Sequence, residues 1–308
     1  MSETRTFLVP DGLQGERVDV GLSRLLGISR TRAAELVSRG KVLVDGQAPA
    51  RSERLFAGST LEAEIPPLPT ALELVPSRVA GMDIVFEDAD IVVVNKPVGV
   101  AAHPSVGWHG PNVLAGLLDA GIQITTSGAQ ERRGIVSRLD VGTSGLMVVA
   151  KSEIAYSVLK NAFRNRLVDK TYLAICQGHP DPMRGTIDAP IGRSANHDYK
   201  YAVMASGKPS ITHYDVIEMF PGAALVETKL ETGRTHQIRV HFSALGHSLI
   251  GDPLYGSDPV LAKRVDLKRQ WLHASGLGFE HPTSGKRVTF EAPLPEDLAH
   301  ALAVLRGS

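Results

Sequence analysis

The sequence predicts an α+β protein in which a small helix-and-hairpin domain precedes a larger domain, whose mixed, mainly antiparallel sheet is flanked by helices and loops. First, prolines cluster within residues 66–76, and such a cluster favours an extended linker. Second, strand-like segments outnumber helical ones and often follow one another directly, unlike the alternation of a doubly wound sheet. Third, 308 residues suffice for more than one domain. We expect domains at 15–66 and 83–308, joined by a linker at 67–82.

The composition is that of an ordinary globular protein, and it favours the cytoplasm. Hydrophobic residues make up 43% of the chain and charged residues 21%. The single cysteine, Cys176, excludes an internal disulfide framework, and its apolar surroundings indicate a core residue. Residues 1–15 lack the apolar core of a signal peptide, and no apolar run is long enough to span a bilayer. The net charge of zero argues against a protein that coats nucleic acid indiscriminately.

The first domain is expected to contain a helix at Arg30–Ser38. Ser29 is placed to cap its N-terminus, and Gly40 is placed to end it. Its apolar positions recur at helical spacing, at Ala33, Leu36 and Val37.

Two short strands should follow this helix, at Val42–Val44 and near Thr60–Ile65. Asp45-Gly46 is a hairpin-turn signal between them. Basic residues exceed acidic ones by six to three across residues 28–54: Arg30, Arg32, Arg39, Lys41, Arg51 and Arg54 against Glu35, Asp45 and Glu53. Such a run is either a solvated face or a surface for an anionic partner.

The second domain should contain several strands and at least two helices. Strands are expected on both sides of residues 87–90 and at Gly145–Lys151, Val168–Cys176, Ser210–Glu218 and Ala223–Leu230. One helix should begin after Ser152 as its cap, and another should span Thr235–Leu245 and end before Gly246.

Residues 134–146 hold the sharpest candidate for chemistry. A short strand at Ile135-Val136 should lead into a polar turn with Arg138 and Asp140, and an apolar strand should follow. An aspartate in a loop most often caps its own turn. A carboxylate between two buried strands can also serve as a fixed reactive group.

Residues 15–66 resemble the S4 RNA-binding domain. The matching segments occur in order: Arg17-Val18-Asp19, Ser29-Arg30-Thr31-Arg32-Ala33, Arg39-Gly40-Lys41-Val42-Leu43-Val44-Asp45-Gly46 and Leu55-Phe56-Ala57-Gly58. The resemblance implies that a basic helix and loop contact structured RNA, with Arg30, Arg32, Arg39 and Lys41 at phosphates. Phosphate contacts position a protein without reading sequence.

Residues 85–292 resemble the RluA-type pseudouridine synthases. Four motifs occur in family order: Asn95-Lys96-Pro97-Val98-Gly99 with His103-Pro104, Arg138-Leu139-Asp140 with Thr143-Ser144-Gly145-Leu146, Lys170-Thr171-Tyr172-Leu173-Ala174, and Glu231-Thr232-Gly233-Arg234-Thr235-His236-Gln237-Ile238-Arg239-Val240-His241. Gly251-Asp252-Pro253-Leu254-Tyr255-Gly256 follows them. Ser137 and Val141 depart from the histidine and lysine that the family usually has there.

The resemblance implies a role for each motif. Asp140 would be the nucleophile, acting on C1′ of the ribose, on C6 of uracil, or by deprotonating the ribose. Arg239 would pair with it, rather than form a surface ion pair, and Tyr172 would stack near the base, rather than serve only as a core aromatic. Arg138 would fill the space of a flipped-out nucleotide. Lys96, Arg234 and His236 are further RNA-contact candidates, with a structural role as the alternative for Lys96.

The expected partner is structured RNA, most simply ribosomal RNA of the large subunit, with transfer RNA left open. The isomerisation has no net redox change or hydrolysis, so we expect neither a cofactor nor a metal. His236 and His241 are five residues apart, which places them on different helix faces. We expect a monomer without a membrane partner. Two other classes compete with this reading: a non-enzymatic RNA-binding or ribosome-assembly factor, and a hydrolase of small nucleosides.

Overall fold

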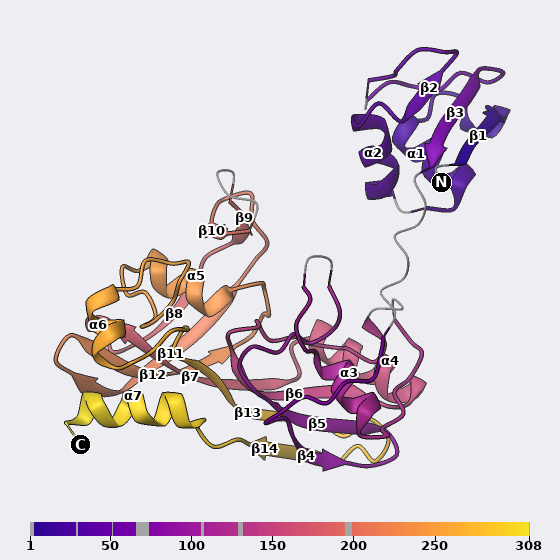
Figure 1. Ribbon diagram of the computed structural model, residues 1–308. Coiled ribbons are helices and arrows are strands. Elements are labelled where there is room, and N and C mark those ends of the chain that lie inside the picture. Colours follow the sequence, from indigo (N-terminus) through magenta and orange to yellow (C-terminus); the bar gives the residue numbers. More distant parts are fainter. Residues whose placement is uncertain are drawn as a thin grey trace. The chain divides into compact units, whose positions relative to one another are not determined.

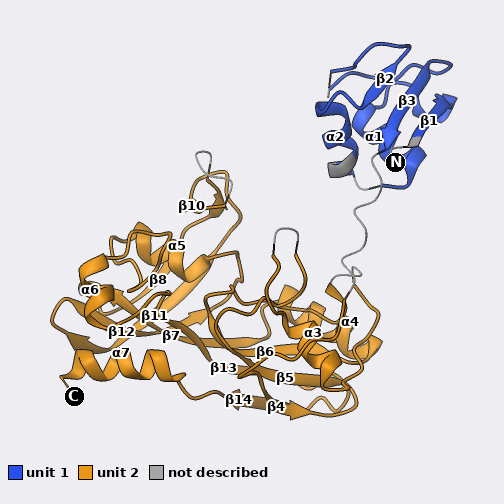
Figure 2. Ribbon diagram, in the orientation of Figure 1, with its two compact units in different colours: residues 1–71 blue, residues 72–308 orange. Residues whose placement is uncertain are grey.

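The protein is described by a computed structural model that covers residues 3–28, 30–50, 52–65, 74–105, 108–128, 132–194 and 199–307. For residues 3, 31 and 32 it describes the backbone alone. The chain divides into two compact units, residues 1–71 and 72–308 (Figure 2). Each unit is described by itself.

The first unit packs two helices against a three-stranded antiparallel sheet. The sheet has the order β1 (Glu3–Leu8), β3 (Thr60–Ile65) and β2 (Val42–Val44). The helices are α1 (Val18–Leu26) and α2 (Arg30–Ser38), and a 3₁₀ turn spans Asp11–Leu13. Both helices and β3 contribute buried side chains to one core, among them Leu22, Leu36 and Leu61, and Leu55 from the segment before β3 joins them.

In the first unit, the structure confirms the expected helix and both expected strands at their predicted ranges. Asp45-Gly46 does form a tight turn, because Val44 and Gln47 exchange backbone hydrogen bonds, but this turn leads to Gln47 and not directly to β3. Neither β1, which precedes residue 15, nor α1 was predicted from the sequence. The predicted cap Ser29 and residues 67–73 of the predicted linker lie outside the described residues.

The second unit is built on a nine-stranded sheet (Figure 1). Its order is β4 (Asp83–Glu87), β5 (Ile91–Lys96), β6 (Ser144–Ala150), β13 (Leu272–Glu280), β7 (Asp169–Gln177), β12 (Ala223–Leu230), β11 (Ile211–Phe220) and β8 (Arg184–Asp188), with β14 (Arg287–Glu291) paired to β13. The pair β6–β13 is parallel, and the other pairs are antiparallel. The predicted mixed, mainly antiparallel sheet is therefore confirmed.

Helices pack on both faces of this sheet because its central strands are apolar on both faces. On β5 and β6, α3 (Val113–Asp119) packs against Val92 and Val94, whereas α4 (Glu153–Arg164) packs against Ile91 and Val93. On β7 and β12, α5 (Gln237–Ala244) shares a core with Ala174, and α7 (Glu296–Arg306) shares one with Ile175. Ser152 caps α4 as predicted.

Three smaller elements complete this unit. A two-stranded sheet joins β9 (Ile191–Arg193) to β10 (Tyr201–Val203), and α6 is a short helix at Pro259–Arg264. The expected strand at Ile135-Val136 is wrong, since Ile135 makes only a single bridge, to Val149. Every helix in the described part of the chain is too short or too polar to cross a membrane.

Candidate active site

Asp140 lies in a loop that is fixed at its exit by close backbone packing. The loop leads into β6, where Gly145 has a φ of +118° and packs against the backbone of Ala274 on β13. A side chain on Gly145 would put its Cβ 2.2 Å from the Ala274 carbonyl oxygen. The parallel pairing of β6 and β13 therefore needs glycine here, and it sets where Asp140 emerges.

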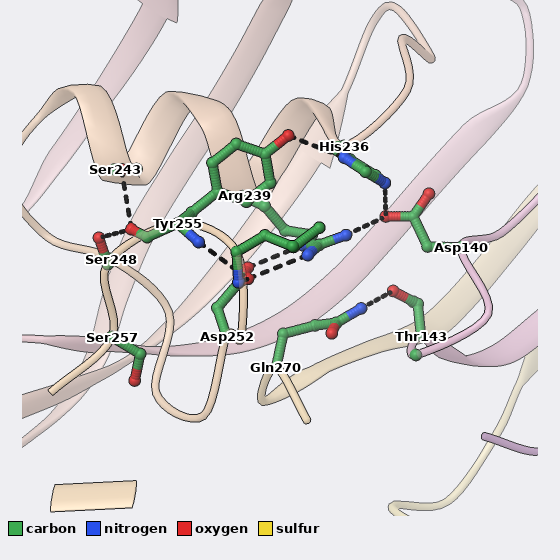
Figure 3. Close-up of polar contacts among 12 residues, drawn as sticks. Asp140, Thr143, His236, Arg239, Ser243, Ser248, Asp252, Tyr255, Ser257 and Gln270 are labelled. Atoms are coloured by element: carbon green, nitrogen blue, oxygen red, sulfur yellow. Dashed lines mark hydrogen bonds and ion pairs between the residues drawn. The ribbon is translucent and has the colours of Figure 1, made fainter. Parts of the chain in front are cut away.

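Two residues that precede β13 hold the middle of the same loop. Gln270 donates to the Thr143 hydroxyl at 3.1 Å (Figure 3), and Arg269 donates to the Gly142 carbonyl at 3.2 Å. Arg269 is itself held by two hydrogen bonds to Asp297 at the start of α7. The loop is thus tied to a helix far away in the sequence.

Arg239 on α5 contacts Asp140 from the buried side of the site. Its Nη1 lies 3.1 Å from Oδ2 of Asp140, while its Nε and Nη2 bind both carboxylate oxygens of Asp252 at 2.7 and 2.9 Å (Figure 3). Only 4% of the Arg239 side chain and none of the Asp252 side chain is exposed, against 22% for Asp140. Burial opposes the charge, but the two carboxylates outweigh it and raise the pKa of Arg239.

His236 is the second side chain that faces Asp140. It precedes α5 in the left-handed conformation, with φ +59°, and its Nε2 lies 3.8 Å from Oδ2 of Asp140. Its Nδ1 is 2.8 Å from the hydroxyl of Tyr255 (Figure 3). Burial lowers the pKa of His236 below its ordinary value, although Asp140 opposes this. We therefore expect a neutral imidazole near pH 7.

Asp140 borders two hollows that share part of their lining. A cavity of about 480 Å³ is lined by Arg138, Asp140, His236 and Arg239 together with His103, Ser105 and Lys268. A smaller pocket of about 70 Å³ shares Arg138, Asp140, His236 and Arg239 and adds Tyr172. The larger cavity falls within the size range of small-ligand sites, so it has room for a nucleotide.

Tyr172 on β7 lines the smaller pocket beside Asp140. Burial, followed by the negative charge of Asp140, raises the pKa of its phenol. The hydroxyl therefore stays protonated at physiological pH, and the ring presents a neutral aromatic surface. The structure brings together the three residues that the sequence assigned to catalysis: Asp140, Tyr172 and Arg239.

The RNA-contact candidates in this unit are placed very differently from one another. Arg138 reaches the Thr235 hydroxyl at the rim of both hollows, and Arg234 is exposed and donates to the Pro209 carbonyl at 3.2 Å. Lys96 is fully buried and donates to the carbonyls of Pro97 and Val100 at 3.0 and 2.8 Å. The expected phosphate contact of Lys96 is therefore wrong, because its ammonium does not reach the surface.

The basic residues of the first unit differ in their partners. Arg30 lies 3.2 Å from Asp19, and Lys41 lies 2.6 Å from Glu64. Arg39 is exposed, and among the described residues it has no acidic partner. The side chain of Arg32 lies outside the described residues.

The sequence assigned no role to several residues that support the site. Asp252 and Tyr255 belong to the segment Gly251–Gly256, but its sequence does not indicate that Arg239 and His236 are their partners. Arg269 and Gln270 fell outside every motif, and no sequence signal marks them. Among the described residues, no group of three or more histidine, cysteine, aspartate or glutamate side chains could hold a metal ion.

Comparisons with known proteins agree with this geometry. A family model described as RNA pseudouridylate synthase matches residues 90–244. An uncharacterized RNA pseudouridine synthase of Mycobacterium bovis is 58% identical over 98% of both chains. The ribosomal large subunit pseudouridine synthase D of Zymomonas mobilis is 39% identical over 96% of this chain and 95% of its own. The solved structure of human RNA pseudouridylate synthase domain containing 1 has a TM-score of 0.58 and 31% identity, covering 71% of this chain and 86% of that one.

Proposed function

The chain belongs to the RNA pseudouridylate synthase family, and we propose that it isomerises uridines of large-subunit ribosomal RNA with Asp140 as the nucleophile. Membership of the family makes it an RNA-modifying isomerase. The target RNA and the role of Asp140 are the parts that we propose.

One observation supports the role of Asp140 above all: its partly exposed carboxylate borders a nucleotide-sized cavity while a buried arginine holds it from behind. Contact with the guanidinium orients a carboxylate. Breaking the bond between uracil and ribose calls for a carboxylate near the anomeric carbon, as in glycosidases. Attack on C1′, addition to C6 and deprotonation of the ribose all fit this placement.

Two further side chains would handle the flipped nucleotide. Tyr172 would pack against the uracil ring in the smaller pocket, since its neutral phenol presents an aromatic face there. Arg138, at the rim of both hollows, would occupy the space that the flipped nucleotide leaves. Extracting a base from a helix costs a few kcal/mol, so a side chain that replaces it lowers this cost.

The proposed target rests on relatives and on the first unit. Several relatives about 40% identical over nearly the whole chain are named ribosomal large subunit pseudouridine synthase D. The first unit would be an S4-like RNA-binding domain, with Arg30, Arg32, Arg39 and Lys41 near phosphates. Arg39 is the strongest of these candidates, because its charge is exposed and unpaired among the described residues.

Base-resolution mapping of pseudouridine tests the proposal. Ribosomal and transfer RNA would be compared between cells without the protein and cells complemented with wild type, Asp140→Asn or Asp258→Asn. Asp258→Asn is a matched control, because Asp258 caps α6 and asparagine caps a helix about as well. We expect large-subunit sites to disappear on deletion and to return with wild type and the control only.

Two other outcomes would contradict the proposal. Sites lost only from transfer RNA would overturn the target. Full restoration by Asp140→Asn would overturn the nucleophile, since an amide cannot replace a carboxylate in that role.

A further inference from the structure

One short turn, Gly251–Gly256, lies behind both groups that face Asp140. It supplies Asp252, which binds Arg239, and Tyr255, which binds His236 (Figure 3). The turn itself does not contact Asp140 through either side chain. Its influence on the carboxylate therefore passes through Arg239 of α5 and through His236, which precedes that helix.

Asp252 fixes Arg239 with two hydrogen bonds and is itself fixed by the backbone. Its Oδ1 accepts from the N–H groups of Leu254 and Tyr255 at 2.9 and 3.2 Å, in addition to Nη2 of Arg239. A two-point contact between a planar guanidinium and a carboxylate sets the plane of the arginine. Only Nη1 is left to point at Asp140, so the position of Asp252 decides where that nitrogen lies.

Tyr255 acts on both groups. The guanidinium of Arg239 lies over its ring, 5.0 Å from the centroid. Its hydroxyl accepts from the backbone N–H of Tyr201 at 3.1 Å, which leaves the phenolic proton for Nδ1 of His236 at 2.8 Å. A neutral His236 that accepts at Nδ1 carries its proton on Nε2, the nitrogen that faces Asp140.

Arg239 and His236 converge on the same oxygen of Asp140. Both Nη1 and Nε2 face Oδ2, at 3.1 and 3.8 Å (Figure 3). Among the described residues, no donor or cation contacts Oδ1. The protein thereby holds the carboxylate by Oδ2, and Oδ1 is left for the substrate.

We propose that Asp252 and Tyr255 are positioning residues, which orient the Asp140 carboxylate through Arg239 and His236 so that Oδ1 faces the reacting nucleotide. The inference rests on the proposed nucleophile, Asp140. It gives Asp252 and Tyr255 a role in the chemical step and none in RNA affinity.

The first test replaces Asp252 with asparagine. The amide oxygen can still accept from Leu254, Tyr255 and Nη2 of Arg239, but the NH₂ that replaces Oδ2 then faces the Nε–H of Arg239, and the guanidinium is displaced. We expect the single-turnover rate at saturating enzyme to fall by about 100-fold, the typical cost of a 1 Å misplacement. RNA affinity should not change. Asp258→Asn is the matched control and should react at the wild-type rate.

The second test replaces Tyr255 with phenylalanine, which keeps the ring beside Arg239 and removes only the hydroxyl. We expect the single-turnover rate to fall by about 10-fold, as for other residues that orient a site from behind. Tyr214→Phe is the control, because it also removes a tyrosine hydroxyl, one that donates to the Pro182 carbonyl away from the site.

A pH profile separates positioning from a loss of stability. His236 is faced by the charges of Asp140, Arg138, Arg239 and Asp252 and by the aromatic rings of Tyr201 and Tyr255. The Tyr255 hydroxyl stabilises the neutral imidazole, so its removal should raise the pKa of His236. The acid limb of the single-turnover rate should therefore move to higher pH in Tyr255→Phe and stay in place in Tyr214→Phe.

The outcomes are distinguishable from failure of the proposed nucleophile. Wild-type rates in both Asp252→Asn and Tyr255→Phe, with Asp140→Asn inactive, would overturn this inference alone. An active Asp140→Asn would overturn the proposed function. Losses that only follow RNA affinity or melting temperature would make the turn structural and would also overturn the inference. If Asp252→Asn does not fold, the rate and pH profile of Tyr255→Phe decide.

Discussion

At the scale of single residues, Lys96 shows how the fold accommodates a buried ionisable side chain that interacts with the charge of Asp140. Its ammonium is fully buried and bound to the carbonyls of Pro97 and Val100. Burial lowers its pKa from 10.5 to about 7, with the charge of Asp140 acting against this and that of Arg269 adding to it. Lys96 is thus a structural residue whose pKa is set mainly by burial.

This shift predicts how stability depends on pH. Between pH 7 and 10.5 the unfolded chain holds a proton on Lys96 that the folded chain has lost, so stability should rise with pH in this window. We expect the unfolding free energy of wild type, relative to Lys96→Met, to rise by up to about 1.4 kcal/mol per pH unit. Chemical denaturation from pH 6.5 to 10 measures this. The unfolding free energy of wild type relative to Lys263→Met, which removes an exposed lysine, should not change with pH in this way. If the curves of wild type and Lys96→Met run parallel over this range, the shift is disproved.

At the scale of elements, the junction of β6 and β13 fixes the loop that carries Asp140. Gly145→Ala would combine an unfavourable φ with a Cβ 2.2 Å from the Ala274 carbonyl. We expect a loss of about 3 kcal/mol or more, from backbone strain and overpacking together. In a domain of this size that corresponds to a fall of roughly 10 °C in melting temperature.

Gly233→Ala is the control for this junction, since nothing lies within 4 Å of its added Cβ and its φ is ordinary. Equal melting temperatures for the two variants would show that the parallel pair adapts to a side chain at residue 145.

Elements with strong local signals could be predicted from the sequence, and elements held by distant contacts could not. Ser152 before an amphipathic run predicted α4 because a cap and a periodic face act locally. In contrast, α1 has no side-chain cap and contains Gly21, which packs beneath Leu55. The helix α7 was detectable, since Leu298, Ala301, Leu302 and Leu305 recur at helical spacing.

The same distinction applies to the site. Motifs pointed to Asp140, Tyr172 and Arg239, which the structure brings together from a loop, a strand and a helix. The contacts of Arg269 with Gly142 and of Gln270 with Thr143 join residues 127 apart in the sequence, and no local pattern reports such a contact. For Lys96 the sequence left a phosphate contact and a structural role open, because the depth of a strand end depends on its neighbours.

At the scale of the whole molecule, a chain with no net charge has to bind RNA, which is a polyanion. The 33 basic and 33 acidic residues cancel, so RNA binding must rely on local clusters of charge. In the first unit, ion pairs with Asp19 and Glu64 partly neutralise Arg30 and Lys41, whereas Arg39 has no acidic partner among the described residues. A side chain without an internal ion pair can bind phosphate without breaking an existing contact.

These differences predict a ranked effect on salt dependence. If the first unit contacts RNA phosphates, Arg39→Ala should lower the slope of log affinity against log salt by about 0.7–0.9, the value for one lost phosphate contact. Arg30→Ala should lower it less, because Arg30 already pairs with Asp19. The control is Arg306→Ala, which removes an exposed arginine paired with Glu218 in the second unit and should leave the slope unchanged. Filter binding to ribosomal RNA over a salt series measures all three slopes. Identical slopes for Arg39→Ala and wild type would remove this surface from the interface, and the cavity around Asp140 would then have to supply the phosphate contacts through Arg138 and Lys268.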